Sequence, residues 1–120
     1  MSDLVNSPKH YTSHASGIEA IEICELCDFS TGNAVKYLFR AGLKGSLLQD
    51  LQKAAWYLRR ALSRGAPPLR AVLAYEVIKA EPEGSVLRDV LQHLVLADMP
   101  RIDLALARVE REIERVQEEK

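Results

Sequence analysis

The chain has 120 residues, of which 48% are hydrophobic, and its formal net charge is −1. This composition excludes a disordered protein and predicts a single domain, 1–120, with a real core. Charge is unevenly distributed along the sequence. Residues 29–70 hold eight Lys or Arg and one acidic residue, whereas residues 71–120 hold seven Lys or Arg and eleven acidic residues. The basic charge is therefore local, which favours an anion site and disfavours general binding to nucleic acid.

The start of the sequence, its apolar runs and its cysteines give an expectation for the cellular compartment. The start, "MSDLVNSPKH", lacks the apolar stretch of a signal peptide, and no run approaches the roughly 20 apolar residues of a membrane helix. Cys24 and Cys27 have the C-x-x-C spacing of a redox pair or half a zinc site, but no second pair follows. We expect two reduced thiols, with Cys24 buried, in a soluble cytoplasmic protein without a membrane partner.

In chain order, an N-terminal arm over residues 1–16 precedes a first helix over 18–27. One side of this helix is apolar, and a row of acids recurs at every third position: Glu19, Glu22 and Glu25. The predicted apolar side consists of Ile18, Ile21, Cys24 and Leu26. A second helix begins at a cap, Ser30 or Thr31, and ends near Gly42.

The third predicted helix runs from the cap Ser46 to about Arg64, where Gly65 stops it. Its expected buried positions are Leu47, Leu51, Ala54, Ala55, Leu58 and Leu62. After the break "GAPP", we expect helices over 69–80 and 86–97 and a last amphipathic helix after Pro100. We therefore predict an all-α fold, a compact bundle of five to six helices, with residues 17–64 carrying the site.

The last helix repeats apolar residues at coiled-coil spacing: Ile102, Leu106, Val109, Ile113 and Val116. Only about two heptads are present, so self-association and packing on its own domain both remain open. The C-terminal helices, 69–120, are the expected place for an oligomer contact.

Helices two and three each carry a polar row. The second has Asn33, Lys36, Tyr37, Arg40 and Lys44 along one side, and the third has Asp50, Lys53, Tyr57 and Arg60, with Trp56 beside them. The short connection "GLKGS" makes the helices antiparallel neighbours, so both rows are expected to border one cleft. Lys and Arg there suit phosphate, and the rings suit a base. Alternatively, the cations form a solvated face, Trp56 fills core, and Asp50 pairs with a basic residue.

Two further groups of residues could take part in the chemistry: the acidic row of the first helix and the arm. The acidic row on the first helix could hold Mg²⁺ as in helical nucleotide pyrophosphohydrolases, but helix three adds only Asp50, with Lys53 where an acid is wanted. His10 and Tyr11 lie on the arm, where a histidine could close over a ligand. No G-x-x-x-x-G-K-[ST] motif is present, which excludes a P-loop kinase.

Three segments in order, "SPKHYTSHASGIEAIEI", "GNAVKYLFRAGLKG" and "DLQKAAWYLRRAL", resemble a small phage family catalogued as a domain of unknown function. Its recognised branch is the nucleotide kinase of T-odd coliphages. The resemblance covers about residues 7–62 and implies a phage protein that binds nucleotides as a homo-oligomer, in the host cytoplasm. In the first segment, the motif positions of the family are Pro8, His10, Tyr11, Gly17 and Glu19. In the second and third segments, the motif positions coincide with the polar rows of the second and third helices.

The leading hypothesis is a P-loop-independent kinase of (deoxy)nucleoside monophosphates, with His10, Lys36 and Arg40 as catalytic residues. The expected substrate-binding residues are Tyr11, Asn33, Tyr37, Lys44, Asp50, Lys53, Trp56 and Tyr57. The phosphate donor is a nucleotide, Mg²⁺ is a candidate cofactor, and no protein ligand to a metal is assigned. The alternatives are a protein that sequesters a nucleotide, for example a cyclic oligonucleotide defence signal, and a Mg²⁺-dependent pyrophosphohydrolase.

Overall fold

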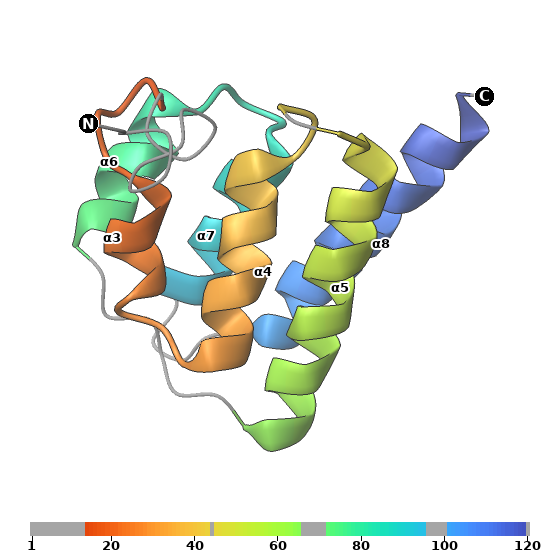
Figure 1. Cartoon of the computed structure of the whole chain (residues 1–120), viewed down its shortest axis with the longest axis horizontal. Helices are drawn as coiled ribbons and strands as arrows, with labels where there is room; N and C mark the ends of the chain where they lie inside the picture. Colours follow the sequence, from red (N-terminus) through yellow and green to blue (C-terminus); the bar gives the residue numbers. More distant parts are fainter. Residues whose placement is uncertain (1–13, 44, 66–71, 96–100, 120) are drawn as a thin grey trace.

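The computed structural model describes residues 14–43, 45–65, 72–95 and 101–119, and within these ranges the chain forms six helices and no strand (Figure 1). This confirms the predicted all-α fold. The helices are α3 (Ala20–Cys24), α4 (Phe29–Arg40), α5 (Leu47–Arg64), α6 (Leu73–Ala80), α7 (Val86–Val95) and α8 (Ile102–Glu118). None of them has the length and hydropathy needed to cross a membrane.

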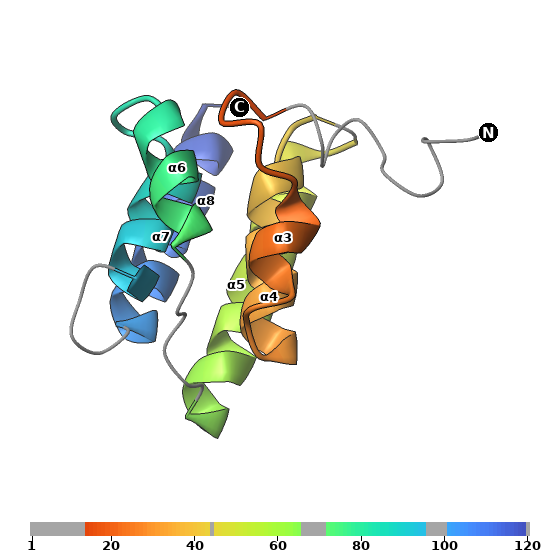
Figure 2. The ribbon, with the colours of Figure 1, turned by 90° about the vertical axis from the view of Figure 1, so that its left-hand side faces the viewer.

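The helices form two layers, with α3, α4 and α5 in one and α6, α7 and α8 in the other (Figure 2). Helices α4 and α5 lie side by side and run antiparallel, as predicted (Figure 1). The core lies between the layers and contains fully buried side chains from both, such as Val35, Leu51, Leu58, Val90 and Val109. Because α4 and α5 bury one side in this core, their polar rows are left on the outer side of the layer.

The predicted limits of α5 are confirmed and the predicted start of α4 is wrong. The Ser46 hydroxyl accepts a hydrogen bond from the Gln49 N–H at 3.1 Å, and Gly65 ends α5 with φ of 69°. The cap of α4 is Asp28, whose Oδ2 faces the N–H of Thr31 at 3.5 Å. The helix therefore begins before Ser30 and Thr31, both of which are buried inside it.

The first helix is shorter than predicted. A reciprocal capping box, Glu19 with Glu22, starts α3, and the helix ends at Cys24. The expected apolar side is correct in part: Ile18 and Cys24 pack partly buried against the core, whereas Ile21 and Leu26 are exposed. Ala20 and Ile23 are the buried residues of this helix. A similar error of one position affects α5, where Ala61 is buried and Leu62 is exposed.

The apolar seam of α8 packs on its own domain. Ile102, Leu106 and Val109 are buried in the common core, and Ile113 and Val116 pack partly buried against it. This part of the seam is therefore used within the chain, and self-association remains a prediction. The predicted ends of the two preceding helices, residues 69–71 and 96–97, lie outside the described residues, as does the arm before His14.

Candidate functional site

Aromatic rings from α4 and α5 meet on the outer surface of their layer. Tyr37 and Tyr57 stack with ring centroids 6.0 Å apart and planes within 12°. The rings of Trp56 and Phe29 lie in T-shaped contact with Tyr57, with ring centroids 5.0 and 6.3 Å from that of Tyr57. Phe29 is 77% exposed and Trp56 is 55% exposed, so both present ring surface to solvent. Trp56 is therefore not a core residue, and its ring can stack on a ligand.

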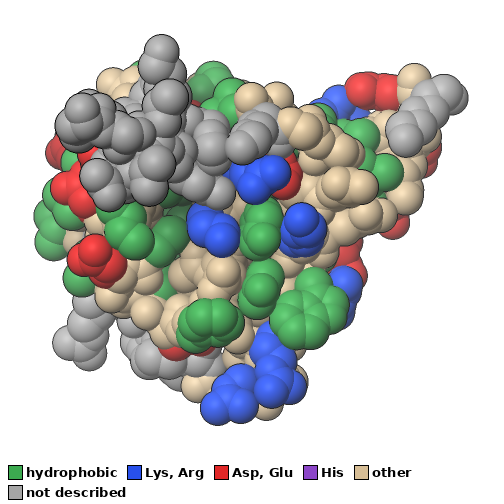
Figure 3. Space-filling model, in the orientation of Figure 1, with side chains coloured by type: hydrophobic (Ala, Val, Ile, Leu, Met, Phe, Trp, Pro, Cys, Tyr) green, Lys and Arg blue, Asp and Glu red, His purple; other side chains and the backbone are tan. Residues whose placement is uncertain are grey.

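Two lysines converge on the same cluster. The Lys36 Nζ lies 4.8 Å from the centroid of the Tyr37 ring, and the Lys53 Nζ lies 5.3 Å from it. Each ammonium gains a cation–π attraction, but two positive charges brought to one ring repel each other. An anion placed beside both would remove this repulsion. We call this surface the basic–aromatic face: Phe29, Lys36, Tyr37, Lys53, Trp56 and Tyr57. Figure 3 shows hydrophobic and basic side chains side by side over α4 and α5.

An ion pair lies at the end of this face, next to the connection between α4 and α5. The Arg40 Nε is 3.4 Å from the Asp50 Oδ1, and the Asp50 side chain is only 3% exposed. The second oxygen, Oδ2, is buried without a hydrogen-bond partner in the described part of the chain. A carboxylate oxygen in this condition is unusual in a folded protein. Asp50 thus holds Arg40 at the edge of the face with part of its own bonding capacity unused.

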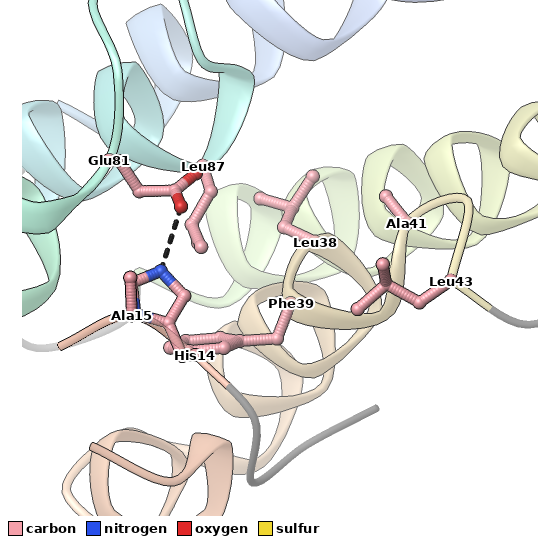
Figure 4. Close-up of a pocket in the computed structure, with 8 residues that line it drawn as sticks. All are labelled: His14, Ala15, Leu38, Phe39, Ala41, Leu43, Glu81 and Leu87. Carbon is pink, nitrogen blue, oxygen red and sulfur yellow. Dashed lines mark hydrogen bonds and ion pairs between the residues drawn. The ribbon is translucent and has the colours of Figure 1, made fainter. Parts of the chain in front are cut away.

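A pocket of about 320 Å³ lies at the same end of α4 (Figure 4). It is lined by His14, Ala15, Leu38, Phe39, Ala41, Leu43, Glu81 and Leu87. The His14 Nε2 and the Glu81 Oε2 are 2.8 Å apart, and the His14 ring packs at 62° against Phe39. Because His14 Nδ1 accepts the N–H of Ser16 at 3.0 Å, the proton of the neutral ring is on Nε2, which donates to Glu81.

Sequence reasoning missed His14 and Glu81. They are 67 positions apart and meet across the two layers. His14 stands in the motif segment "TSHASG", and Glu81 stands between the predicted helices over 69–80 and 86–97. No periodicity links a residue before the first helix to a turn between the fourth and fifth helices, so the signal for this pair is absent from the sequence.

The structure brings together most of the predicted site residues that it describes. Lys36, Tyr37, Lys53, Trp56 and Tyr57 form the basic–aromatic face, and Arg40 and Asp50 lie at its end. Asn33 donates from Nδ2 to the Phe29 carbonyl at 2.8 Å, so one of its two amide hydrogens is used inside α4. The predicted residues His10, Tyr11 and Lys44 lie outside the described residues.

The acidic row of the first helix has a structural role. The Glu22 carboxylate accepts the N–H of Glu19 at 2.7 Å, which completes the capping box. Within the described ranges, no three His, Cys, Asp or Glu side chains gather as ligands of one metal ion would. The row therefore gives the pyrophosphohydrolase alternative no support from this part of the chain.

Cys24 and Cys27 are free thiols, as predicted, and both are partly buried, although Cys24 was expected to be fully buried. Burial raises the pKa of Cys24 to about 11 and that of Cys27 to about 12. The Cys27 Sγ also lies 3.5 Å from the Ile23 carbonyl, to which it donates. Both sulfurs stay protonated at neutral pH, which is the opposite of what a nucleophile or a zinc ligand requires.

Comparison with known proteins gives one match. Residues 5–59 match DUF3310, a family of proteins of unknown function. This DUF3310 domain includes α3, α4 and most of α5, and therefore contains the whole basic–aromatic face together with Arg40 and Asp50. No match was found among curated proteins or among solved structures.

Proposed function

We propose, with the DUF3310 domain as the premise, that this protein binds nucleotides on the basic–aromatic face and transfers a phosphoryl group between them. The observation that carries the proposal is the convergence of Lys36 and Lys53, from two helices, on the ring of Tyr37. The resemblance of the motifs to the phage nucleotide kinases supports the same reaction. The enzyme would convert a (deoxy)nucleoside monophosphate to the diphosphate without a P-loop.

The reaction places a clear demand on the site. The bond from the terminal phosphorus of the donor to its bridging oxygen breaks, and the diphosphate leaves with the electron pair. An oxygen of the acceptor phosphate forms the new bond, and this group is already mostly deprotonated at pH 7, since its second pKa is about 6. No side chain needs to remove a proton, so the predicted acid–base role of His10 is not required. Catalysis depends on alignment and on neutralising negative charge.

The residues of the face fit these needs. Lys36 and Lys53 lie where a phosphate chain between them would be neutralised from two sides. Arg40, held by Asp50, offers a forked guanidinium at the end of the row. The exposed rings of Trp56 and Phe29 provide a stacking surface for the base of the donor. A Mg²⁺ ion carried by the phosphates would add positive charge, as is common for nucleotide substrates.

The test is to incubate the protein with a monophosphate and a triphosphate, with Mg²⁺ or with chelator, and to separate the products by chromatography. We expect new diphosphate, and at least a tenfold loss of its formation in Lys36→Ala and in Arg40→Ala. Lys79→Ala is the matched control, because Lys79 is an exposed lysine on α6 that pairs with Glu76. Diphosphate formation that is equal in all variants would contradict the proposal.

Sequestration of a nucleotide is the second candidate function. The observation that favours it is that cations and rings make up the described face, and such groups bind a nucleotide equally well without turning it over. In this case the protein would return its ligand unchanged after acid release. The same chromatographic experiment therefore separates the two functions.

The predicted homo-oligomer belongs to the proposal as well. The uncovered rings of Phe29 and Trp56 would allow a second copy to border the face. Light scattering coupled to size-exclusion chromatography tests this directly, and a monomeric mass with full nucleotide binding would remove the oligomer from the account.

A further inference from the structure

We infer that the pocket between His14, Phe39 and Glu81 seats the base of the accepting monophosphate, at the opposite end of the phosphate row from the donor base. This inference rests on the proposed function, because it assigns a second nucleotide to the same row of cations. It adds a residue of the C-terminal layer, Glu81, which lies outside the DUF3310 domain, to the recognition of substrate.

The first argument is position. Phe39 lines the pocket, while Lys36 lies one helical turn before it and Arg40 directly after it. Residues three apart on a helix are neighbours, about 5–6 Å apart at their Cβ atoms. The mouth of the pocket and the row of cations therefore adjoin along α4, and a base in the pocket would leave its phosphate beside Lys36 and Arg40.

The second argument is the order of groups along the face. Phe29 and Trp56 are in contact with Tyr57 at one end, and the ion pair of Arg40 with Asp50 marks the other end. The lysines lie between the two ends. Phosphoryl transfer requires two nucleotides with their phosphates meeting and their bases apart. The exposed rings and the pocket provide two such base positions, with the cations between them.

The third argument is the chemistry of the pocket. Its volume of about 320 Å³ is at the lower end of the roughly 300–1,000 Å³ typical of small-molecule sites, which suits a compact planar ring. Among the described side chains that line it, those of His14 and Glu81 are polar and the others are apolar, as Figure 4 shows. Glu81 Oε2 accepts from His14, and Oε1 accepts from the Ser85 hydroxyl at 2.5 Å, so the carboxylate is fixed in place.

The fixed carboxylate indicates what it recognises. Each carboxylate oxygen has more than one acceptor direction, so Glu81 can still take a hydrogen bond from a ligand. A carboxylate accepts and does not donate, so it prefers an exocyclic amino group, whereas the two carbonyl oxygens that flank the single ring N–H of uracil and thymine repel it. The expected occupants are bases with an exocyclic amino group, namely adenine, cytosine or guanine, over uracil and thymine. An amide in place of the carboxylate would present its own N–H to the amino group and weaken the preference.

The experiment measures binding of nucleoside monophosphates, and of inorganic tripolyphosphate as a probe without a base, by calorimetry on the full chain. Ala15→Trp fills the pocket from an exposed position, and Gln117→Trp on α8 controls for an added indole. We expect Ala15→Trp to weaken monophosphate binding at least tenfold and to leave tripolyphosphate binding within twofold. We expect Glu81→Gln to lower the preference for amino-bearing bases about fivefold, and Glu76→Gln to change nothing.

The outcomes distinguish this inference from the proposed function. Monophosphate binding that is within twofold of wild type in both Ala15→Trp and Glu81→Gln would overturn the pocket as the base site, while nucleotide binding itself would stand. If the wild-type affinity for monophosphates is the same for every base, the predicted base preference is absent and the inference also falls alone. If wild type binds neither probe, the proposed function and the inference fall together.

Discussion

The ion pairs of Arg108 and of Arg40 lie in different layers and are built differently. In the C-terminal layer, Arg108 donates from all three guanidinium nitrogens: to Asp89 at 2.6 Å, to Glu112 at 2.9 Å and to the carbonyl of Gly84 at 2.9 Å. Arg108 is only 9% exposed. This network ties α8 to α7 and to the turn before it, and each guanidinium nitrogen of Arg108 has an acceptor, which is the condition for a buried charge to be tolerated.

In the N-terminal layer, Arg40 faces Asp50 across 3.4 Å, and Asp50 keeps a buried oxygen with no hydrogen-bond partner in the described ranges. The pair lies at one end of the basic–aromatic face, and the converging lysines separate it from the exposed rings at the other end. The comparison teaches that arginine and carboxylate together do not identify a site. A hydrogen-bond acceptor for each guanidinium nitrogen indicates a structural role, whereas leftover bonding capacity on a face with exposed rings indicates a place for a ligand.

The largest expected effect is on the ion pairs of Arg108. Arg108→Met should lower the free energy of unfolding by about 3 kcal/mol, because it leaves the partly buried Asp89 carboxylate without this cation and removes one of the two arginines that pair with Glu112. Urea titration measures this. Nucleotide affinity of the folded variant should stay within twofold of wild type. A stability loss below about 0.5 kcal/mol would show that the network is not structural, and the comparison would fail.

On the basic–aromatic face we expect the reverse, a loss of nucleotide affinity with almost no loss of stability. Lys36→Ala should weaken triphosphate binding about tenfold, since one of two converging charges is lost, and change the free energy of unfolding by less than about 0.5 kcal/mol. Calorimetry and urea titration of the same sample give both numbers. Lys79→Ala should change neither. A large stability loss with unchanged affinity would assign Lys36 to the structure instead.

A smaller effect is expected at the exposed indole. Trp56→Ala should weaken binding of a nucleoside triphosphate about fivefold and leave tripolyphosphate binding unchanged, because the ring stacks on the base and not on the phosphates. Leu62→Ala, an exposed apolar truncation on the same helix, is the control. Equal losses for both ligands would indicate that Trp56 acts through the fold.

The smallest expected effect is on the pH dependence of stability, which tests the structural role of the ion pairs of Glu112. Hydrogen bonds from Arg115 and Arg108 hold the pKa of Glu112 below its ordinary value of 4.5, against the opposing effect of burial. A lowered folded-state pKa adds stability above pH 4.5, and this stability is lost as pH falls through the folded-state pKa. Urea titrations from pH 6 to pH 3 should therefore show a shallower decline for Glu112→Gln than for wild type. An identical slope would show that Glu112 does not contribute.

Most of the fold could be predicted from the sequence because it follows from local chemistry. Ser46 and Gly65 set the ends of α5, and the stripes of α4, α5 and α8 define the buried sides. The errors have physical reasons. The true cap of α4, Asp28, is as good an N-cap as the expected Ser30 and lies two residues before it. The α3 capping box starts a helix too short for its period to be read.

The site could be predicted only in part. Rows on two adjacent antiparallel helices indicated the residues that meet on the face, because helical spacing and a short connection determine that surface. The pairing of Arg40 with Asp50 was among the alternatives and is observed. The pocket was not predictable, since His14 and Glu81 meet only through packing of the two layers.

The most direct test of the central claim is phosphorus-31 NMR of the protein mixed with a nucleoside monophosphate, a triphosphate and Mg²⁺. Our account predicts that resonances of new diphosphate grow with time in wild type and in Lys79→Ala, and at least tenfold more slowly in Lys36→Ala. If wild type binds the nucleotides and their spectra stay unchanged, the kinase is contradicted and the face binds its ligand without turning it over.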